Sequence, residues 1–335
     1  MSDAGTIHSQ RYQRWSGKRR LGRWTWAAML ISGLKLRIRD ARNVVLLIPS
    51  AGLMIAAATF FYILMLLEQL AGSPRAQGLY DFVFNFLRVD VSSVGSLAAF
   101  RSVLWRSVFS FMMKIELFYL LILIARLGPS LIADDLKARA LPIYFARPIT
   151  PLTYLWGKWL TIAVFIALGM LVPNLLALFF GTLLTGGLPT WAETLGLALK
   201  LGVVGLAAAL VGGLLILALS SLTSDKRFVA VGWLAVMLLP ALAQRIVNKT
   251  LSEDVTNTWL GSLSLPGNLT ILMDRLLDLR AGWESSGLPA EAFQAALGRP
   301  VDPMYPLIVL SVVTLCAGLL CYRRVLRFCR AAANL

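Results

Sequence analysis

The sequence predicts an all-α integral membrane protein with six transmembrane helices, and three observations support this fold class. The chain has 335 residues, 58% of them hydrophobic, and a mean hydropathy of +0.73, whereas soluble domains are about 45–50% apolar. The apolar residues form six long runs, and a helix needs roughly 20 such residues to cross the hydrocarbon core. Basic residues are concentrated in alternate segments between these runs.

The expected spans follow the apolar runs. They cover residues 44–67, 108–127, 159–180, 195–222, 228–243 and 306–322. Pro173-Asn174 interrupt the third run, and a kink or hinge is expected there, because proline removes a helix hydrogen bond. The fifth and sixth are short, so flanking residues must extend them. The first run is too long for the apolar region of a signal peptide and is expected to be an uncleaved span.

The distribution of basic residues predicts the orientation. The segments on one side of the predicted membrane domain hold 21 Lys and Arg residues, against nine in the longer segments on the other side. Because cytoplasmic loops carry an excess of basic residues, we expect both termini in the cytoplasm and the chain in the inner (plasma) membrane. The predicted parts are a cytoplasmic segment 1–43, a membrane domain 44–322 and a cytoplasmic tail 323–335. The same asymmetry explains the net charge of +15, so no nucleic-acid partner is expected.

Several kinds of chemistry do not fit the composition. The only histidine is His8, and the three cysteines lie in or just after the last apolar run, which leaves no pattern for a serine triad or a zinc site. The pairs Gly17-Lys18 and Gly157-Lys158 lack the other residues of a P-loop. We therefore expect no enzyme activity and no cofactor, and any ATP hydrolysis would occur in a separate subunit.

The stretch before the first span, residues 24–43, combines apolar and basic side chains. Trp24, Trp26 and Leu30 suit a helix at the membrane interface, and basic side chains such as Lys35 can extend toward the lipid headgroups. One interpretation is an amphipathic elbow helix that also meets a cytoplasmic partner. The alternative is a segment whose charges only set the topology.

The loop between the second and third spans is the most informative segment. Asp134 and Asp135 would stand at the start of a short helix, where carboxylates interact favourably with the helix dipole. Pro142 and Pro148 disfavour helical geometry in the residues that precede them. We expect a stiff cytoplasmic helix from Asp134 to Arg147 and then a rigid turn into the third span, an arrangement suited to transmitting force.

This loop, residues 131–158, resembles the cytoplasmic motif of type-2 ABC exporter permeases. The family motif has an acidic pair, a small residue, an apolar stretch, arginine or serine before Pro-Ile-Ser/Thr, then tyrosine and Gly-Lys. The matching residues here are Asp134, Asp135, Ala140, Leu141, Arg147, Pro148, Ile149, Thr150, Tyr154, Gly157 and Lys158. The sequence departs from the motif at Ala140, where the family often has glycine, and at Pro151, where it often has a basic residue.

The resemblance implies that this loop is a coupling helix that docks into a groove of the ATP-binding subunit. The residues expected to couple the chain to that subunit are Asp134, Asp135, Lys137, Arg139, Leu141, Tyr144, Arg147, Pro148 and Lys158. The resemblance covers nearly the whole chain, because the basic stretch before the first span and the six-span plan also fit the family.

Three polar residues inside the predicted spans are candidates for a substrate path or a gate. Lys114 and Glu116 lie in the second span, and Asn174 lies in the third. Charges within a membrane often mark functional sites. Lys114 is also close enough to the outer end of its span for the side chain to reach the interface, so a purely structural role stays open.

The longest segment expected outside the membrane covers residues 244–305. Its most regular run is 271–280, in which Leu272, Met273 and Leu276 form a helical stripe. We expect an amphipathic helix on the outer membrane surface. The resemblance implies a gate for substrate exit here, and a docking site for a partner is the alternative.

The expected function follows from the resemblance. The chain would be the permease subunit of an ABC transporter, an exporter that forms the substrate path and couples it to a separate ATP-binding subunit. Its expected partners are that subunit, a second copy or a related permease, and the lipid membrane. The alternative is a membrane-embedded scaffold or assembly factor without transport activity, with which no ATPase would co-purify.

Overall fold

The computed structural model describes residues 25–69, 97–145, 149–185, 191–250, 262–279 and 302–333. Within these ranges all the regular elements are helices, and six stretches are long and apolar enough to cross a membrane. These stretches are Ala41–Leu66, Leu104–Leu127, Pro151–Thr185, Trp191–Leu222, Lys226–Val247 and Met304–Arg330. The predicted helical fold with six candidate spans is confirmed at this level.

Two short helices precede the first long one. The chain begins with α1 (Thr25–Ile38), α2 (Ala41–Val45) and α3 (Ile48–Gln69). Asp40 lies between α1 and α2, and its carboxylate accepts a hydrogen bond of 3.2 Å from the Arg42 backbone N–H. This bond satisfies one of the backbone donors that the first turn of a helix leaves unpaired.

The third span is continuous and is made of α8 (Pro151–Ile166), a π-helical turn η2 (Ala167–Leu171) and α9 (Val172–Thr185). Pro173-Asn174 do not end the helix, and the π-helical turn lies directly before them. Pro173 has no N–H to donate to the Gly169 carbonyl four residues earlier. That carbonyl instead accepts a hydrogen bond of 2.8 Å from Ser50 Oγ of α3, so the helix continues through the proline.

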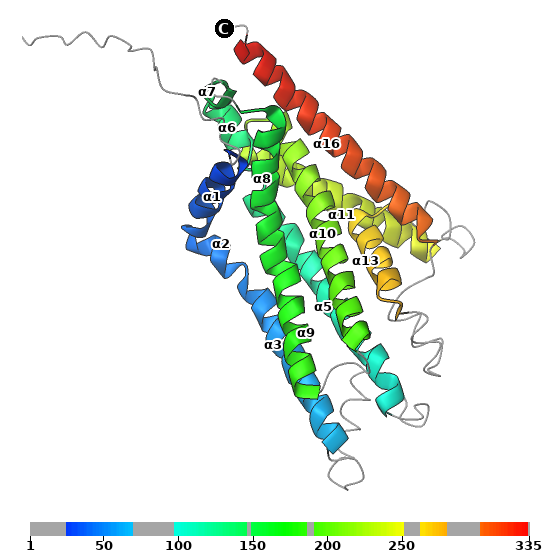
Figure 1. Ribbon diagram of the computed structural model, residues 1–335. Coiled ribbons are helices and arrows are strands. Elements are labelled where there is room, and N and C mark those ends of the chain that lie inside the picture. Colours follow the sequence, from blue (N-terminus) through cyan, green and yellow to red (C-terminus); the bar gives the residue numbers. More distant parts are fainter. Residues whose placement is uncertain are drawn as a thin grey trace, which may run out of the picture.

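The remaining helices are α5 (Leu97–Leu127), α6 (Ala133–Lys137), α7 (Leu141–Phe145), α10 (Trp191–Leu222), α11 (Lys226–Thr250), α13 (Leu265–Leu276) and α16 (Met304–Ala333). The fifth and sixth spans, predicted at 228–243 and 306–322, extend into flanking residues as expected. Helix α11 continues through Pro240 to Thr250, so the predicted outer segment begins later than residue 244. Figure 1 shows a tilted bundle with α1, α6, α7 and the C-terminal end of α16 at one end.

Close packing between helices depends on glycine at several contacts, two of which lie in α9 and α10. A Cβ atom at Gly181 of α9 would lie 2.8 Å from Phe61 Cδ2 of α3, and Phe61 in turn packs on Trp105 with ring centroids 4.4 Å apart. A Cβ atom at Gly213 of α10 would lie 2.9 Å from Trp159 Nε1 of α8. Both positions exclude a larger side chain unless the neighbouring aromatic ring moves.

Helix α1 lies against the start of α8. A Cβ atom at Gly33 would lie 2.7 Å from Thr161 Oγ1, and one at Gly157 would lie 2.7 Å from Met29 Cβ. Small residues on both helices therefore allow their backbones to approach closely. The helix predicted before the first span is present from Thr25, and one of its faces is fixed to the third span.

Helix α13 differs from the helix predicted for residues 271–280. It begins earlier, because the Ser264 hydroxyl caps its first turn and Pro266 fits a position that needs no backbone donor. It packs against α5, α10, α11 and α16. Asn268 and Met273 are fully buried. The prediction of a helix lying on the outer membrane surface is therefore wrong, and α13 is part of the bundle.

Candidate functional site

The segment between α5 and α8, called here the α5–α8 segment, contains the predicted coupling residues. The single helix predicted from Asp134 to Arg147 is wrong, since the structure has two short helices, α6 and α7. Arg139 separates them with a φ of +50°, a left-handed conformation that ends a helix. Pro142 lies in the first turn of α7, where proline is tolerated, and does not end a helix. Arg147 and Pro148 lie outside the described residues.

Ser220 of α10 fixes the start of α6. Its hydroxyl accepts hydrogen bonds from the backbone N–H groups of Ile132 (3.1 Å) and Ala133 (3.0 Å) and donates one to the Pro129 carbonyl (2.8 Å). The first N–H groups of a helix have no partner within the helix. A side chain from the fourth span therefore supplies the cap that α6 does not make for itself.

Asp135 of α6 connects the segment to α8. Its carboxylate accepts a hydrogen bond from Tyr154 Oη at 2.6 Å and pairs with Lys158 Nζ at 2.6 Å. The side chains of Asp135 and Lys158 are only 14% and 18% exposed, so solvent screens this pair less than a surface ion pair. Two of the predicted coupling residues thus contact one another across the junction with the third span.

Aromatic contacts hold α7 against the same part of α8. The Tyr144 and Phe145 rings lie 6.0 Å and 5.9 Å from the Tyr154 ring, measured between centroids, and Leu141 is buried. Burial raises the pKa of Tyr144, and the nearby Asp135 carboxylate raises this pKa further. Both effects disfavour a tyrosinate here, and α7 also packs against α16.

The exposed face of the α5–α8 segment is small and mixed in character. It is made of Asp134, Lys137, Arg139, Pro142 and Ile143, all of them exposed. Ile143 has 66% of its surface exposed although it is apolar. Three predicted coupling residues therefore face outward, whereas the other described ones hold the segment in place.

A polar network connects α1, α2 and the end of α5. Arg37 donates to Ser130 Oγ at 3.0 Å, and Arg126 pairs with Asp40 at 3.0 Å and donates to Asn43 Oδ1 at 2.9 Å. Burial lowers the pKa of Arg37, while two carboxylates of α6 act in the opposite direction. The guanidinium groups of both arginines thus join helices that are distant in sequence.

Two lysines within spans, Lys114 and Lys200, are paired with acidic residues of the α13 region. Lys114 of α5 lies 2.9 Å from Asp274, whose carboxylate also accepts a hydrogen bond of 2.8 Å from Ser110. Lys200 of α10 pairs with Asp278. Lys114 therefore has a direct structural partner, and the structural interpretation of this residue is favoured over a substrate path.

Glu116 and Asn174, the other two candidates, contact each other in the interior of the bundle. Asn174 Nδ2 donates to the Glu116 carboxylate and to the Met170 carbonyl, the latter at 2.6 Å. Glu116 and Asn174 have no exposed surface. Lys114 is only two positions from Glu116 on α5, but it pairs with Asp274, so the three predicted residues do not form one site.

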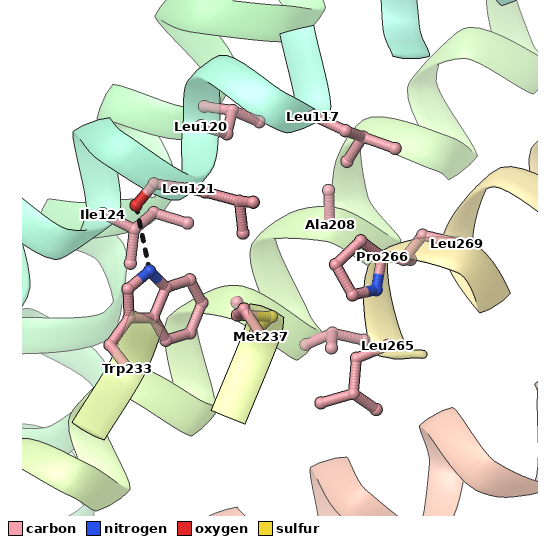
Figure 2. Close-up of a pocket in the computed structure, with 12 residues that line it drawn as sticks. Leu117, Leu120, Leu121, Ile124, Ala208, Trp233, Met237, Leu265, Pro266 and Leu269 are labelled. Carbon is pink, nitrogen blue, oxygen red and sulfur yellow. Dashed lines mark hydrogen bonds between the residues drawn. The ribbon is translucent and has the colours of Figure 1, made fainter. Parts of the chain in front are cut away.

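A small apolar cavity lies between α5, α10, α11 and α13. Figure 2 shows it lined by leucine side chains with Trp233 and Met237, and the Trp233 Nε1–H donates to the Leu121 carbonyl at 2.9 Å. The cavity has a volume of about 30 Å³. It is too small for an organic substrate in this conformation, and its apolar wall offers no partner for a water molecule.

The sequence did not indicate the roles of three residues, Ser220, Asp274 and Asp278. Ser220 lies in a Ser-Ser pair at the end of an apolar span, and two hydroxyls there are a signal that a backbone group must be bound nearby. Asp274 and Asp278 are four positions apart, a spacing that would place both acids on one face of the predicted helix 271–280, although α13 ends at Leu276. Across the described ranges no group of His, Cys, Asp or Glu side chains gathers in a way that would hold a metal ion.

Comparisons with family models and with curated proteins identify no relative of this chain. No family model matches the chain, and no curated protein matches it. The inference of function therefore rests on the residues and contacts described above.

Proposed function

We propose that this chain is the permease subunit of an ABC transporter, an exporter that works with a separate ATP-binding subunit and with a second copy or a related permease. Six candidate spans support the proposal, as does the motif resemblance of the α5–α8 segment. In this proposal the bundle end that carries α1, α6 and α7 faces the cytoplasm.

The observation that carries the proposal is the way the α5–α8 segment is fixed. Ser220 of α10, Lys158 of α8 and Arg37 of α1 each bind a residue of this segment. A partner that pushed on its exposed face would therefore move three helices rather than a loose loop. A conformational cycle needs a partner that binds two states with different affinities, and this face offers such a partner a rigid contact.

The test is charge reversal on the exposed face. The variant Lys137→Glu/Arg139→Glu is expected to lower co-purification of the ATP-binding subunit by about tenfold or more, because two charged contacts at a docking surface are reversed. The matched control is Arg323→Glu/Arg327→Glu, the same change at two exposed positions of α16. Equal retention of the subunit by both variants would refute the assigned docking face.

Transport activity separates the proposal from its rival. The purified chain in liposomes should hydrolyse no ATP alone and should gain turnover when the co-purified ATP-binding subunit is added. A scaffold without transport activity would give no turnover in either case. Leu141 is unsuitable for such tests, because it is only 2% exposed and a polar substitution would destabilise the fold.

A further inference from the structure

A polar cluster surrounds the π-helical turn inside the bundle. Glu116 comes from α5, Asn174 from α9 and Ser50 from α3, and they meet the Met170 and Gly169 carbonyls of η2. The three side chains are buried, with at most 1% of their surface exposed. Single π turns occur often at functional sites, and here Asn174 bonds both this turn and Glu116, the only carboxylate of the second span.

Two hydrogen-bond acceptors of this cluster have no donor. Both hydrogens of the Asn174 amide are used, one on the Glu116 carboxylate and one on the Met170 carbonyl. Glu116 Oε1 and Asn174 Oδ1 are buried acceptors without a donor. Leaving buried polar atoms unpaired is unfavourable, and these two acceptors each lack a donor.

The charge of an ionised Glu116 would not be balanced either. The ion pairs formed among the described residues do not include Glu116. On α5 itself, Lys114 pairs with Asp274, and Tyr119 contributes only a hydroxyl. Burying a carboxylate in an apolar interior is far more costly than burying a neutral acid.

Titratable groups on the helices that pack around Glu116 lie far from it along the helix or pair with other residues. Helix α9 and η2 contain none. On α3, Tyr62 and Glu68 lie at least about 18 Å along the helix from Ser50, at 1.5 Å per residue. Lys158 of α8 pairs with Asp135, and Lys200 of α10 pairs with Asp278. The charged residues of α11 and Glu193 of α10 stand at helix ends, and Arg275 of α13 is exposed.

We propose that Glu116 is a proton-binding site within the membrane domain, with Asn174 and the π turn as its surroundings. A proton removes the uncompensated charge and supplies the missing donor. The proton comes from water and returns to water, so no other reactant is needed. Loss of the proton would leave a buried charge, which favours an arrangement of α5 and α9 that admits water. Proton occupancy is thereby linked to the packing of the second and third spans, whatever the chain transports.

Infrared spectroscopy of the full-length protein in lipid bilayers tests this inference. At neutral pH we expect a carbonyl stretch of a protonated carboxyl that shifts in heavy water and is lost in Glu116→Gln. The matched control is Asp274→Asn, which removes a carboxyl paired with Lys114 and should leave the band intact. Absence of the band in the native protein, or its equal loss in the control, would overturn the proposal.

Asn174→Ala is a second variant that tests the proposal in case Glu116→Gln does not fold. Asn174→Ala keeps the carboxyl but removes its hydrogen-bond partner, so the band should remain and move in frequency. A band that stays at the same frequency in this variant belongs to another carboxyl and would also overturn the assignment. These measurements need no ATP-binding subunit, so their outcome is independent of the proposed transporter function.

Discussion

At the scale of single residues, one hydroxyl group has a large structural effect. Ser220 lies at the end of the fourth span and binds three backbone groups of the α5–α8 segment. It is fully buried, so water cannot replace these bonds if the hydroxyl is removed. The position of α6 therefore depends on a side chain that lies 88 positions away in the sequence from Ile132.

Ser220→Ala should lower the free energy of unfolding by about 1–3 kcal/mol, because it leaves buried backbone groups without a partner. The control is Ser221→Ala. Ser221 is equally buried, but its hydroxyl bonds the Ala218 carbonyl of its own helix and the Cys321 side chain, and it caps no backbone group of another helix. Its loss should therefore cost less than about 1 kcal/mol. Denaturation of the detergent-solubilised chain measures both, and equal losses would contradict the capping role.

The sequence identified unusual residues within the spans but not their partners. Lys114, Glu116 and Asn174 stand out because polar groups are rare in apolar runs. Their pairing depends on which helices pack together. Asp274 was assigned to the outer surface, so its contact with Lys114 was not foreseen. Glu116 and Asn174 are 58 positions apart, and no local pattern relates positions so distant.

At the scale of elements, the α5–α8 segment shows why helix ends are hard to predict. Acidic residues at the start and prolines further along predict one helix with a stiff end. The structure places Pro142 at the start of a second helix instead. Proline is compatible with both places, and the turn at Arg139 decides between them. Non-glycine residues in this conformation are uncommon, so the turn at Arg139 could not be predicted from the residue types.

The ion pair between Asp135 and Lys158 should couple α6 energetically to α8. Lys158→Met or Asp135→Asn alone leaves one charge largely buried, and we expect each single variant to be clearly destabilised. The double variant leaves no unpaired charge. Its loss of unfolding free energy should be smaller than the sum of the two single losses, with a coupling of about 1–3 kcal/mol. Additive losses in the double-mutant cycle would show that the pair does not connect the two helices.

At the scale of the whole molecule, the six spans are predictable because each depends mainly on the length of one apolar run. A membrane-crossing helix needs about 20 apolar residues, and this signal is local in the sequence. The ends of the spans were less accurate, because helix geometry continues into polar flanks, as in α11 and α16. The placement of α13 could not be predicted, because its length and polarity suit both a surface helix and a packed one.

The arrangement of the bundle also bears on its orientation in the membrane. Helices α1, α6 and α7 and the C-terminal end of α16 lie at one end (Figure 1). These are the elements that carry, or adjoin, the basic segments of the chain. Among the described residues, most Lys and Arg therefore lie toward this end. It is the end that faces the cytoplasm in the proposed function, because cytoplasmic segments carry an excess of basic residues.

Cysteine labelling in intact cells measures this orientation. The test starts from a variant in which Cys316, Cys321 and Cys329 are replaced, and introduces one cysteine at Ser32 of α1 or at Lys249 near the end of α11, both exposed. A membrane-impermeant maleimide should label position 249 directly and position 32 only after the membrane is permeabilised, because a full span separates α6 and α7 from the far end of α11. Labelling of position 32 but not 249 in intact cells would reverse the orientation. The exposed face of the α5–α8 segment would then lie outside the cell, where no ATP-binding subunit can reach it.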